Sequence, residues 1–452
     1  MGLGAVLQNV LLIGMFGTPL VLAFGLLLSG APSAERVRWF VGLAALTVAL
    51  CALGLLPFVE QPVAFEITWL PEAGPMRLSL GTTSLYAAAA TALAAVVALG
   101  LAAPEAPLSV HGGALALLAL SAGNGAFLAD HFLLRYIALE VVGLCIAVAP
   151  LLQGRERDRL GHAGWVYLLL RLGDAGLLVA ILLLGVQTGT FEIGPALAAG
   201  MALPPSIQAW IAGGFFLAVA VKVGLWPFHT WVASGERLQR GTHTWLYATL
   251  MPNLGLYLLY RVAPLGAATR ALQLMLLGAG VLAAILALLA MLRVASRARY
   301  AARITALVVA ALWCAALLAG GDVAWWGLLV LSFARLPFFL PLPSPVAEAR
   351  EEPLEHALDR GLVRIAVWLQ QRVELGFLEE GLAATARFLV TLAEQLYEVV
   401  EQQGLEGLLR GLVRRTLQSS RKVQGWHSGR LRINLWWLVL CLILAIGFVL
   451  LY

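Results

Sequence analysis

Charge is what this sequence has least of. Only 12% of its 452 residues are charged and 61% are hydrophobic, whereas soluble domains have roughly 25% charged and roughly 45–50% apolar residues. The mean hydropathy is +0.88. A soluble chain of this length could not bury so much apolar surface, so lipid must be the solvent for most of it.

The sequence also lacks the motifs of common catalytic and cofactor-binding sites. No Rossmann, P-loop or zinc-type motif occurs, and no Ser/His/Asp or Cys/His set suggests hydrolysis. We therefore expect no metal, no cofactor and no nucleic-acid partner for this chain. The cysteines lie far apart in apolar runs, without metal or redox spacing, and we interpret them as small hydrophobic residues. They are Cys51, Cys145, Cys314 and Cys441.

Long apolar runs are what the sequence has instead. Each is long enough for a membrane-spanning helix, which needs roughly 20 residues. The first run has no basic region before it, so we interpret it as a span and not as a cleaved signal. The pattern predicts an all-α polytopic membrane protein with about twelve spans. They cover about 3–29, 37–58, 81–102, 108–128, 131–152, 162–187, 206–233, 243–262, 269–293, 301–320, 322–341 and 432–451.

Arginines gather in alternate loops between these spans, and the other loops have few. By the positive-inside rule, the arginine-rich loops face the cytoplasm. We therefore expect a multi-pass protein of the bacterial inner (cytoplasmic) membrane with both termini outside and with 153–161, 293–304 and 346–425 inside. The arginines are Arg36, Arg38, Arg155, Arg157, Arg159, Arg237, Arg240, Arg293, Arg297, Arg299 and Arg303.

Residues 342–430 interrupt the apolar pattern. Pro341, Pro343 and Pro345 break the preceding helix, and apolar residues then recur every three or four positions between charged ones. This predicts a long amphipathic helix that is too polar to span. It could lie on the bilayer as a passive anchor or dock along partner subunits. Its length of some eighty residues favours docking through 346–425. A last span, 431–452, follows.

Two ionisable residues lie in the middle of predicted spans. Glu140 belongs to FLLRYIALEVVGLCIAV and Lys222 to FFLAVAVKVGLWPFHTW. A charge inside the bilayer is costly and marks a functional site by default. If the two residues pair, both stay charged, and opening the pair would release a proton. The alternative is a permanent ion pair that locks two spans together.

Other polar residues lie near these two. Arg171 and Asp174 are three residues apart on one helical face and can neutralise each other. His229 follows Pro227, where a helix would lose a hydrogen bond, and it suits either proton relay or the satisfaction of a freed carbonyl. A further polar group lies along the eighth span, where we also expect a break at Pro252. It comprises His243, Tyr247 and Asn253. Arg335 lies inside the eleventh span, and the sequence names no partner for it.

Three of these segments together resemble a known family. LADHFLLRYIALEVVGLC, RLGDAGLL and K-x-x-x-W-P-F-H-T-W, in this order, resemble the antiporter-like subunits of respiratory complex I and of multi-subunit cation/proton antiporters. The match runs from about 105 to 320. The tail LEGLLRGLVRRTLQSSRKVQGWHSGRLRINLWW is similar to the end of the largest such subunit, where a lateral amphipathic helix leads into a last span.

The resemblance implies a proton channel built of broken helices in two inverted repeats. The family's essential glutamate falls on Glu140, and its central lysine falls on Lys222. Its Arg-x-Gly-Asp motif falls on Arg171 and Asp174. Its Pro-Phe-His turn falls on Pro227 and His229, while Tyr247 occupies a position where the family has histidine.

The chain departs from the family after the eleventh span. The family has several more spans there, and one of them carries a lysine or an acid near the outward exit. This sequence passes directly to its amphipathic segment, so the second repeat is shortened. We thus divide the chain into N-terminal helices (1–104), an antiporter-like core (105–341), the lateral helix (342–430) and the last span (431–452).

The resemblance favours one function over two alternatives. The favoured function is a non-catalytic membrane subunit of a complex-I-like, redox-driven proton-translocating assembly, whose redox centres lie on other membrane and peripheral subunits. One alternative is the membrane subunit of a proton-coupled inorganic-carbon uptake complex. The other is a degenerate scaffold that conducts nothing. The lateral helix favours the first.

Overall fold

A computed structural model gives the fold of the chain. It describes residues 3–28, 33–59, 66–67, 75–100, 108–153, 159–234, 238, 240–291 and 297–336. All of them lie within one compact unit, Met1–Glu374. The predicted lateral helix (342–430) and last span (431–452) lie outside the described residues.

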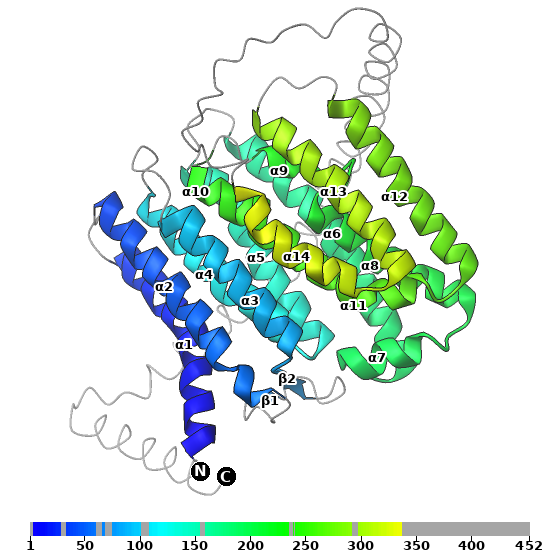
Figure 1. Cartoon of the computed structure of the whole chain (residues 1–452), viewed down its shortest axis with the longest axis horizontal. Coiled ribbons are helices and arrows are strands. Elements are labelled where there is room, and N and C mark those ends of the chain that lie inside the picture. Colours follow the sequence, from blue (N-terminus) through cyan, green and yellow to red (C-terminus); the bar gives the residue numbers. More distant parts are fainter. Residues whose placement is uncertain are drawn as a thin grey trace, which may run out of the picture. The chain divides into compact units, whose positions relative to one another are not determined.

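The described part of the chain is almost entirely helical, and nine of its helices are long and apolar enough to cross a membrane. The prediction of an all-α polytopic membrane protein is thereby confirmed. Figure 1 shows the helices running beside one another, with α1 and α2 at one edge and α12 at the other. The nine are α1 (Leu3–Leu28), α2 (Ala34–Gly54), α3 (Thr82–Ala95) with its extension η3 (Val96–Gly100), α4 (Val110–Leu128), α5 (Phe132–Gln153), α6 (Arg159–Thr188), α8 (Pro205–Val223), α12 (Arg270–Met291) and α13 (Arg297–Ala319).

Two further predicted spans are present in a different form. The eighth consists of α10 (Arg240–Thr242), the wide-turned π-helix η5 (His243–Leu250) and α11 (Met251–Gly266), which follow one another without interruption. The eleventh is the shorter α14 (Asp322–Ala334). Every predicted span up to residue 336 therefore has a helical counterpart in the structure.

Small elements close one end of the helices. Strand β1 (Glu66–Ile67) pairs antiparallel with β2 (Met76–Arg77), and single bridges join Leu78 to Ala129 and His131 to Glu192. The loops before α3, before α5 and before α7 (Ile193–Gly200) are thus held together by backbone hydrogen bonds. A short helix, η1 (Leu56–Phe58), ends the α2 segment.

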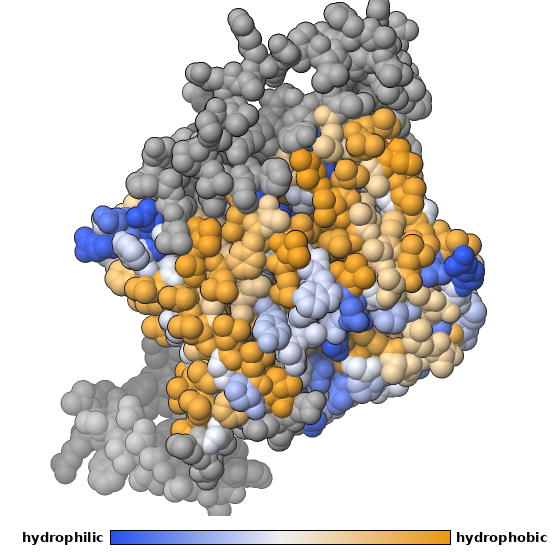
Figure 2. All heavy atoms as spheres, in the orientation of Figure 1, coloured by the Kyte–Doolittle hydropathy of each residue, from blue (hydrophilic) through white to orange (hydrophobic). Residues whose placement is uncertain are grey.

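The outer sides of the helices are apolar. The face in Figure 2 is covered largely by hydrophobic residues. Helices α1 and α12 are the least covered of the spans, with only 28% of each hydrophobic window buried inside the protein. Such surfaces suit the acyl chains of lipids or the helices of other subunits.

Prolines inside the spans leave backbone carbonyls that neighbouring helices satisfy. A proline has no N–H for the carbonyl four residues before it. Pro19, Pro150 and Pro252 each free such an oxygen, and in each case a side chain from another helix donates to it. The pairs are Met15 O with Asn124 Nδ2 (3.2 Å), Ile146 O with Tyr247 Oη (2.6 Å) and Ala248 O with Arg335 Nη1 (3.0 Å).

These contacts correct the prediction for Pro252 and give Arg335 a partner. The expected break at Pro252 is wrong, because the helix continues through Pro252 from η5 into α11. The π-helical turns widen the backbone before the proline, and Arg335 binds the carbonyl that the proline frees. Arg335, for which the sequence named no partner, thus holds a backbone oxygen of the eighth span.

The expected break in the seventh span is present. Helix α8 ends at Val223, and Gly224 follows in the left-handed conformation with φ +67°. Glycine adopts this conformation without steric cost, and the Leu225 N–H closes the end by donating to the Ala220 carbonyl at 2.8 Å. The next helix is the short α9 (Thr230–Ser234). Lys222 therefore lies in the last turn of a broken helix.

Candidate functional site

Lys222 forms a buried ion pair with Asp174. Its Nζ lies 2.5 Å from Asp174 Oδ1, and the two side chains are 0% and 2% exposed. Lys222 occupies the C-terminal turn of α8, where the partial negative charge of the helix end favours a cation. The helix end and the carboxylate thus both attract the Lys222 ammonium.

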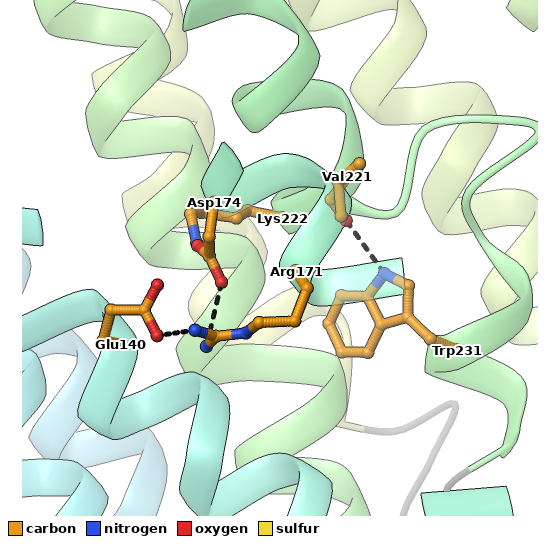
Figure 3. Close-up of polar contacts among 6 residues, drawn as sticks. All are labelled: Glu140, Arg171, Asp174, Val221, Lys222 and Trp231. Carbon is orange, nitrogen blue, oxygen red and sulfur yellow. Dashed lines mark hydrogen bonds and ion pairs between the residues drawn. The ribbon is translucent and has the colours of Figure 1, made fainter. Parts of the chain in front are cut away.

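Arg171 extends this pair toward α5. It lies one turn before Asp174 on α6, with its Nη2 3.1 Å from Asp174 Oδ2, and its Nη1 forms an ion pair with Glu140 Oε2. The charges alternate in sign along the row Glu140, Arg171, Asp174, Lys222, which we name the ion-pair chain (Figure 3). The two carboxylates and two cations balance each other, as buried charges require.

The ion-pair chain differs from the pairing that the sequence suggested. Glu140 on α5 and Lys222 on α8 have no direct contact among the described interactions. They are joined through Arg171 and Asp174 on α6, which also pair with each other as expected. Asp174 therefore touches both cations and is the central member.

Close packing of α6 on α8 brings Asp174 to Lys222. Gly176, two residues after Asp174 on α6, faces Gly214 of α8, which lies eight residues before Lys222. A Cβ added to Gly214 would lie 2.5 Å from the Gly176 carbonyl oxygen, so a larger side chain would force the helices apart. Two facing glycines thus allow the backbones of α6 and α8 to approach each other closely.

The other end of the ion-pair chain reaches the surface of the described chain. The side chains of Arg171 and Glu140 are 26% and 16% exposed, and Glu140 Oε1 has no hydrogen-bond partner among the described residues. Glu140 lies between the exposed Ile137 and Leu144 on α5. The Arg171 guanidinium also lies 5.1 Å from the ring centroid of Tyr167. Titratable groups therefore face outward at the middle of two spans.

An aromatic group packs against the last turn of α8. Trp231 Nε1 donates to the Val221 carbonyl at 2.8 Å, which fixes α9 against the last turn of α8. The Trp231 ring centroid is 5.9 Å from that of Tyr247, which is 6.0 Å from that of His243. His243 Nε2 lies 2.8 Å from the Val232 carbonyl oxygen. Sequence reasoning included Trp231 only as the last letter of a quoted motif and assigned it no role.

The remaining predicted site residues lie outside the ion-pair chain, at separate places in the structure. His229 is buried in the turn between α8 and α9, two residues after Pro227, and is not a member of the ion-pair chain. Tyr247 donates its hydroxyl hydrogen to the Ile146 carbonyl. Asn253 donates to Thr91 and Ser332 on α3 and α14. The polar residues of the eighth span therefore contact different helices and do not form a single row.

The arrangement suits the movement of protons more than bond-making chemistry. In the part of the chain that the structure describes, no group of three or more His, Cys, Asp or Glu side chains could hold a metal ion. A row of alternating charges couples its members, because neutralising one changes the stability of the next. Protonation of Glu140 would therefore change the electrostatic stabilisation of the Lys222 ammonium.

Comparisons with known proteins point to the same helices. Residues 129–302 match the family model described as NADH:quinone oxidoreductase/Mrp antiporter, transmembrane. This segment of the chain, which we call the antiporter-like domain, is similar to that family. The domain includes all four members of the ion-pair chain.

Curated relatives support the assignment of the antiporter-like domain. The chain is 26% identical over 254 residues to the A/B component of a probable K(+)/H(+) antiporter of Rhizobium meliloti, with 53% of this chain and 25% of the relative covered. It is also 26% identical over 138 residues to NADH-quinone oxidoreductase subunit L of Campylobacter jejuni, with 30% of this chain and 23% of the relative covered. The chain thus spans about a quarter of the length of these relatives.

Solved structures share the fold of the antiporter-like domain and the helices before it. A chain of the Mrp complex from Dietzia sp. DQ12-45-1b aligns with a TM-score of 0.65 at 19% identity, covering 74% of this chain and 37% of that one. A chain of respiratory complex I from Thermus thermophilus aligns with a TM-score of 0.60 at 23% identity, covering 73% and 70%. At these identities the likeness concerns the fold.

Proposed function

We propose that this chain is a membrane subunit of a complex-I-like, redox-driven proton-translocating assembly, and that the ion-pair chain transfers protons within it. The observation that carries the proposal is the alternating row Glu140, Arg171, Asp174, Lys222 across α5, α6 and α8. Similarity to quinone oxidoreductase subunits supports the kind of assembly. The redox centres would belong to partner subunits.

The proposed step begins at Glu140. A proton arriving on Glu140 removes one of the two carboxylates that hold Arg171, so the guanidinium turns fully to Asp174. Asp174 then shares its charge with Arg171 and stabilises the Lys222 ammonium less. Lys222 therefore releases its proton more readily, toward the side of Trp231, Tyr247 and His243. The row is restored when Glu140 loses its proton and Lys222 takes up a proton in place of the one it released.

A partner subunit is proposed to cover the α5–α6 surface. Arg171 and Glu140 are partly exposed in the middle of their spans, and hydrocarbon cannot stabilise such charges. A neighbouring membrane subunit with a polar residue at this depth would contact the exposed parts of the Arg171 and Glu140 side chains and exchange protons with Glu140. We further propose that the amphipathic segment 346–425 contacts such subunits, and that 153–161, 293–304 and 346–425 face the cytoplasm.

Similarity to a component of a K(+)/H(+) antiporter supports a second candidate. That relative covers more of this chain than the subunit L match does, so a redox-independent cation/proton antiporter assembly is the alternative. Mass spectrometry of the complex that copurifies with the tagged chain separates the two. Iron–sulfur and quinone-site subunits are expected. A complex made only of other membrane antiporter subunits would replace the first candidate with the second.

A separate measurement tests proton transfer. The purified complex is reconstituted in liposomes with a pH-sensitive dye inside, and electron transfer is started with the donor that its redox subunits accept. We expect Glu140→Gln to reduce proton movement per electron while the complex remains assembled. An unchanged ratio would remove Glu140 from the proton path.

A further inference from the structure

Arg335 is a buried cation that the ion-pair chain does not use. It directly follows α14 and is 2% exposed. It lies one turn beyond Ser332 on the face that α14 buries, whereas Val330 and Phe333 are exposed. Its Nη1 donates to the Ala248 carbonyl of η5. The guanidinium therefore lies between α14 and the eighth span, away from the lipid-facing side.

The charge of Arg335 is not balanced within the described chain. Its Nε and Nη2 have no hydrogen-bond partner among the described residues, and no carboxylate of those residues forms an ion pair with it. Arginine does not deprotonate in proteins. A neutral carbonyl cannot cancel a full charge, and an isolated buried ion is very costly. The two free N–H groups form one edge of a planar fork that suits a negative ligand.

The surroundings of Arg335 are polar enough to hold a small ligand. Asn253 of α11 donates to Thr91 Oγ1 of α3 at 3.0 Å and to Ser332 Oγ of α14 at 2.7 Å. All three side chains are buried. A polar seam thus joins α3, α11 and α14 beside the guanidinium. Arg335 points inward, away from any subunit packed on the outer face of α14, and this position favours a small diffusible ligand over a side chain of such a subunit.

We propose that the Nε–Nη2 edge of Arg335 binds a small monovalent inorganic anion, such as chloride or bicarbonate, between α14 and the eighth span. The anion balances the charge that holds the Ala248 carbonyl. Its binding therefore stabilises the packing of α14 against η5 and α11. This site is independent of the ion-pair chain and of the redox or antiporter nature of the assembly.

Thermal unfolding of the purified full-length chain tests the proposal. The melting temperature Tm is measured at equal ionic strength in sodium chloride, sodium bicarbonate and sodium gluconate, at one pH. Gluconate, a much larger organic anion, is the reference salt. We expect Tm to rise with chloride or bicarbonate in a saturable way, by about 2 °C at ten times the Kd. Stabilisation by bicarbonate alone would identify an oxyanion as the ligand, and stabilisation by both would identify a site open to halides.

Variants separate this site from general salt effects. Arg335→Met keeps a similar length and removes an unbalanced buried charge; it leaves the Ala248 carbonyl unpaired, which costs about 1–3 kcal/mol, so it is expected to fold with a lower Tm. It should lose the anion dependence of Tm. Arg335→Lys should keep part of it, and the control Arg261→Met, at a less buried arginine, should keep all of it. Chloride-35 NMR line broadening should follow the same order.

Two results would overturn the proposal. The first is a wild-type Tm that is the same in all three salts, which would mean that water alone occupies the edge of Arg335. The second is an anion dependence that survives in Arg335→Met, which would place the anion elsewhere. Neither measurement depends on proton flux. The anion site can therefore be disproved while the proposed function stands, and the proposed function can be disproved while the anion site stands.

Discussion

The Lys222 ammonium lies 2.5 Å from the Asp174 carboxylate, and both side chains are closed off from the surface of the protein. This contact makes α6 and α8 electrostatically dependent on each other. Removing one partner leaves the other as an uncompensated buried charge, which costs more than the pair itself contributes. The pair is also the inner end of the ion-pair chain, so its state depends on Arg171 and Glu140.

Asp174→Asn is expected to destabilise the protein strongly. Lys222 would keep only an amide oxygen in place of a carboxylate, and breaking a buried pair costs about 3–5 kcal/mol. The double variant Asp174→Asn/Lys222→Met removes both charges and should recover part of this loss. Thermal unfolding of the purified chain in one detergent measures both effects. A double variant no more stable than Asp174→Asn would mean that the pair is not energetically coupled.

Much of this architecture could be predicted from the sequence. The lengths of the apolar runs predict the spans up to residue 336. A segment that crosses lipid must form its backbone hydrogen bonds internally, and an α-helix of about 20 residues does so. The break in the seventh span was predicted from Pro227, whereas the helix already ends at Gly224 in the structure. Pro252 gave a wrong prediction, since the sequence shows that a hydrogen bond is lost but not that π-helical turns and Arg335 accommodate it.

The geometry of the site could be predicted only in part. The mid-span positions of Glu140 and Lys222, and the i, i+3 spacing of Arg171 and Asp174, follow from local sequence. The order in which these residues touch does not, because it depends on which helix lies between the others. Helix α6 lies between α5 and α8, and this makes Asp174 the direct partner of Lys222.

Glu140→Gln is expected to impair proton transfer without loss of assembly. The amide keeps the shape of the side chain and can still accept a hydrogen bond from Arg171, but it does not titrate. Proton movement per turnover in the reconstituted complex should fall severalfold, while subunit composition by gel filtration stays the same. Val141→Ala, beside it on α5, is the matched control. Loss of subunits in Glu140→Gln would assign the residue an assembly role instead.

The orientation of the chain gives a third prediction. Arginine-rich loops predict that residues 153–161 lie inside. Glu156→Cys, in a background in which the four native cysteines are replaced by serine or alanine, should resist a membrane-impermeant maleimide in intact cells. It should react once the cells are opened. Labelling of Cys at position 156 in intact cells would reverse the proposed topology.

The isolated chain is expected to conduct protons poorly. After Arg303, α13 reads ITALVVAALWCAALLA, without Asp, Glu, Lys or His, and Arg335 does not deprotonate. A neighbouring subunit would have to supply the outward half of the path. Liposomes holding the chain alone, under an imposed potential, should show little change in internal pH. A large flux that Lys222→Ala abolishes would show that the chain completes the path by itself.

Tyr247 is expected to act through a backbone oxygen freed by a proline. Its hydroxyl donates at 2.6 Å to the Ile146 carbonyl, and Pro150 has no N–H to give to that oxygen. Tyr247→Phe leaves the buried oxygen unpaired, which costs about 1–3 kcal/mol. In the Pro150→Ala background, the new N–H can bond the same oxygen, so Tyr247→Phe should cost clearly less.

A double-mutant cycle on unfolding free energy measures the difference. Equal costs in the two backgrounds would show that the hydroxyl serves another partner. Because Tyr247 occupies the family's histidine position, the cycle also bears on its role in proton transfer. If pairing with Ile146 is its whole function, the double variant Pro150→Ala/Tyr247→Phe should move protons as well as Pro150→Ala does. A further loss of proton movement in the double variant would require the hydroxyl itself to take part in the path beside His243.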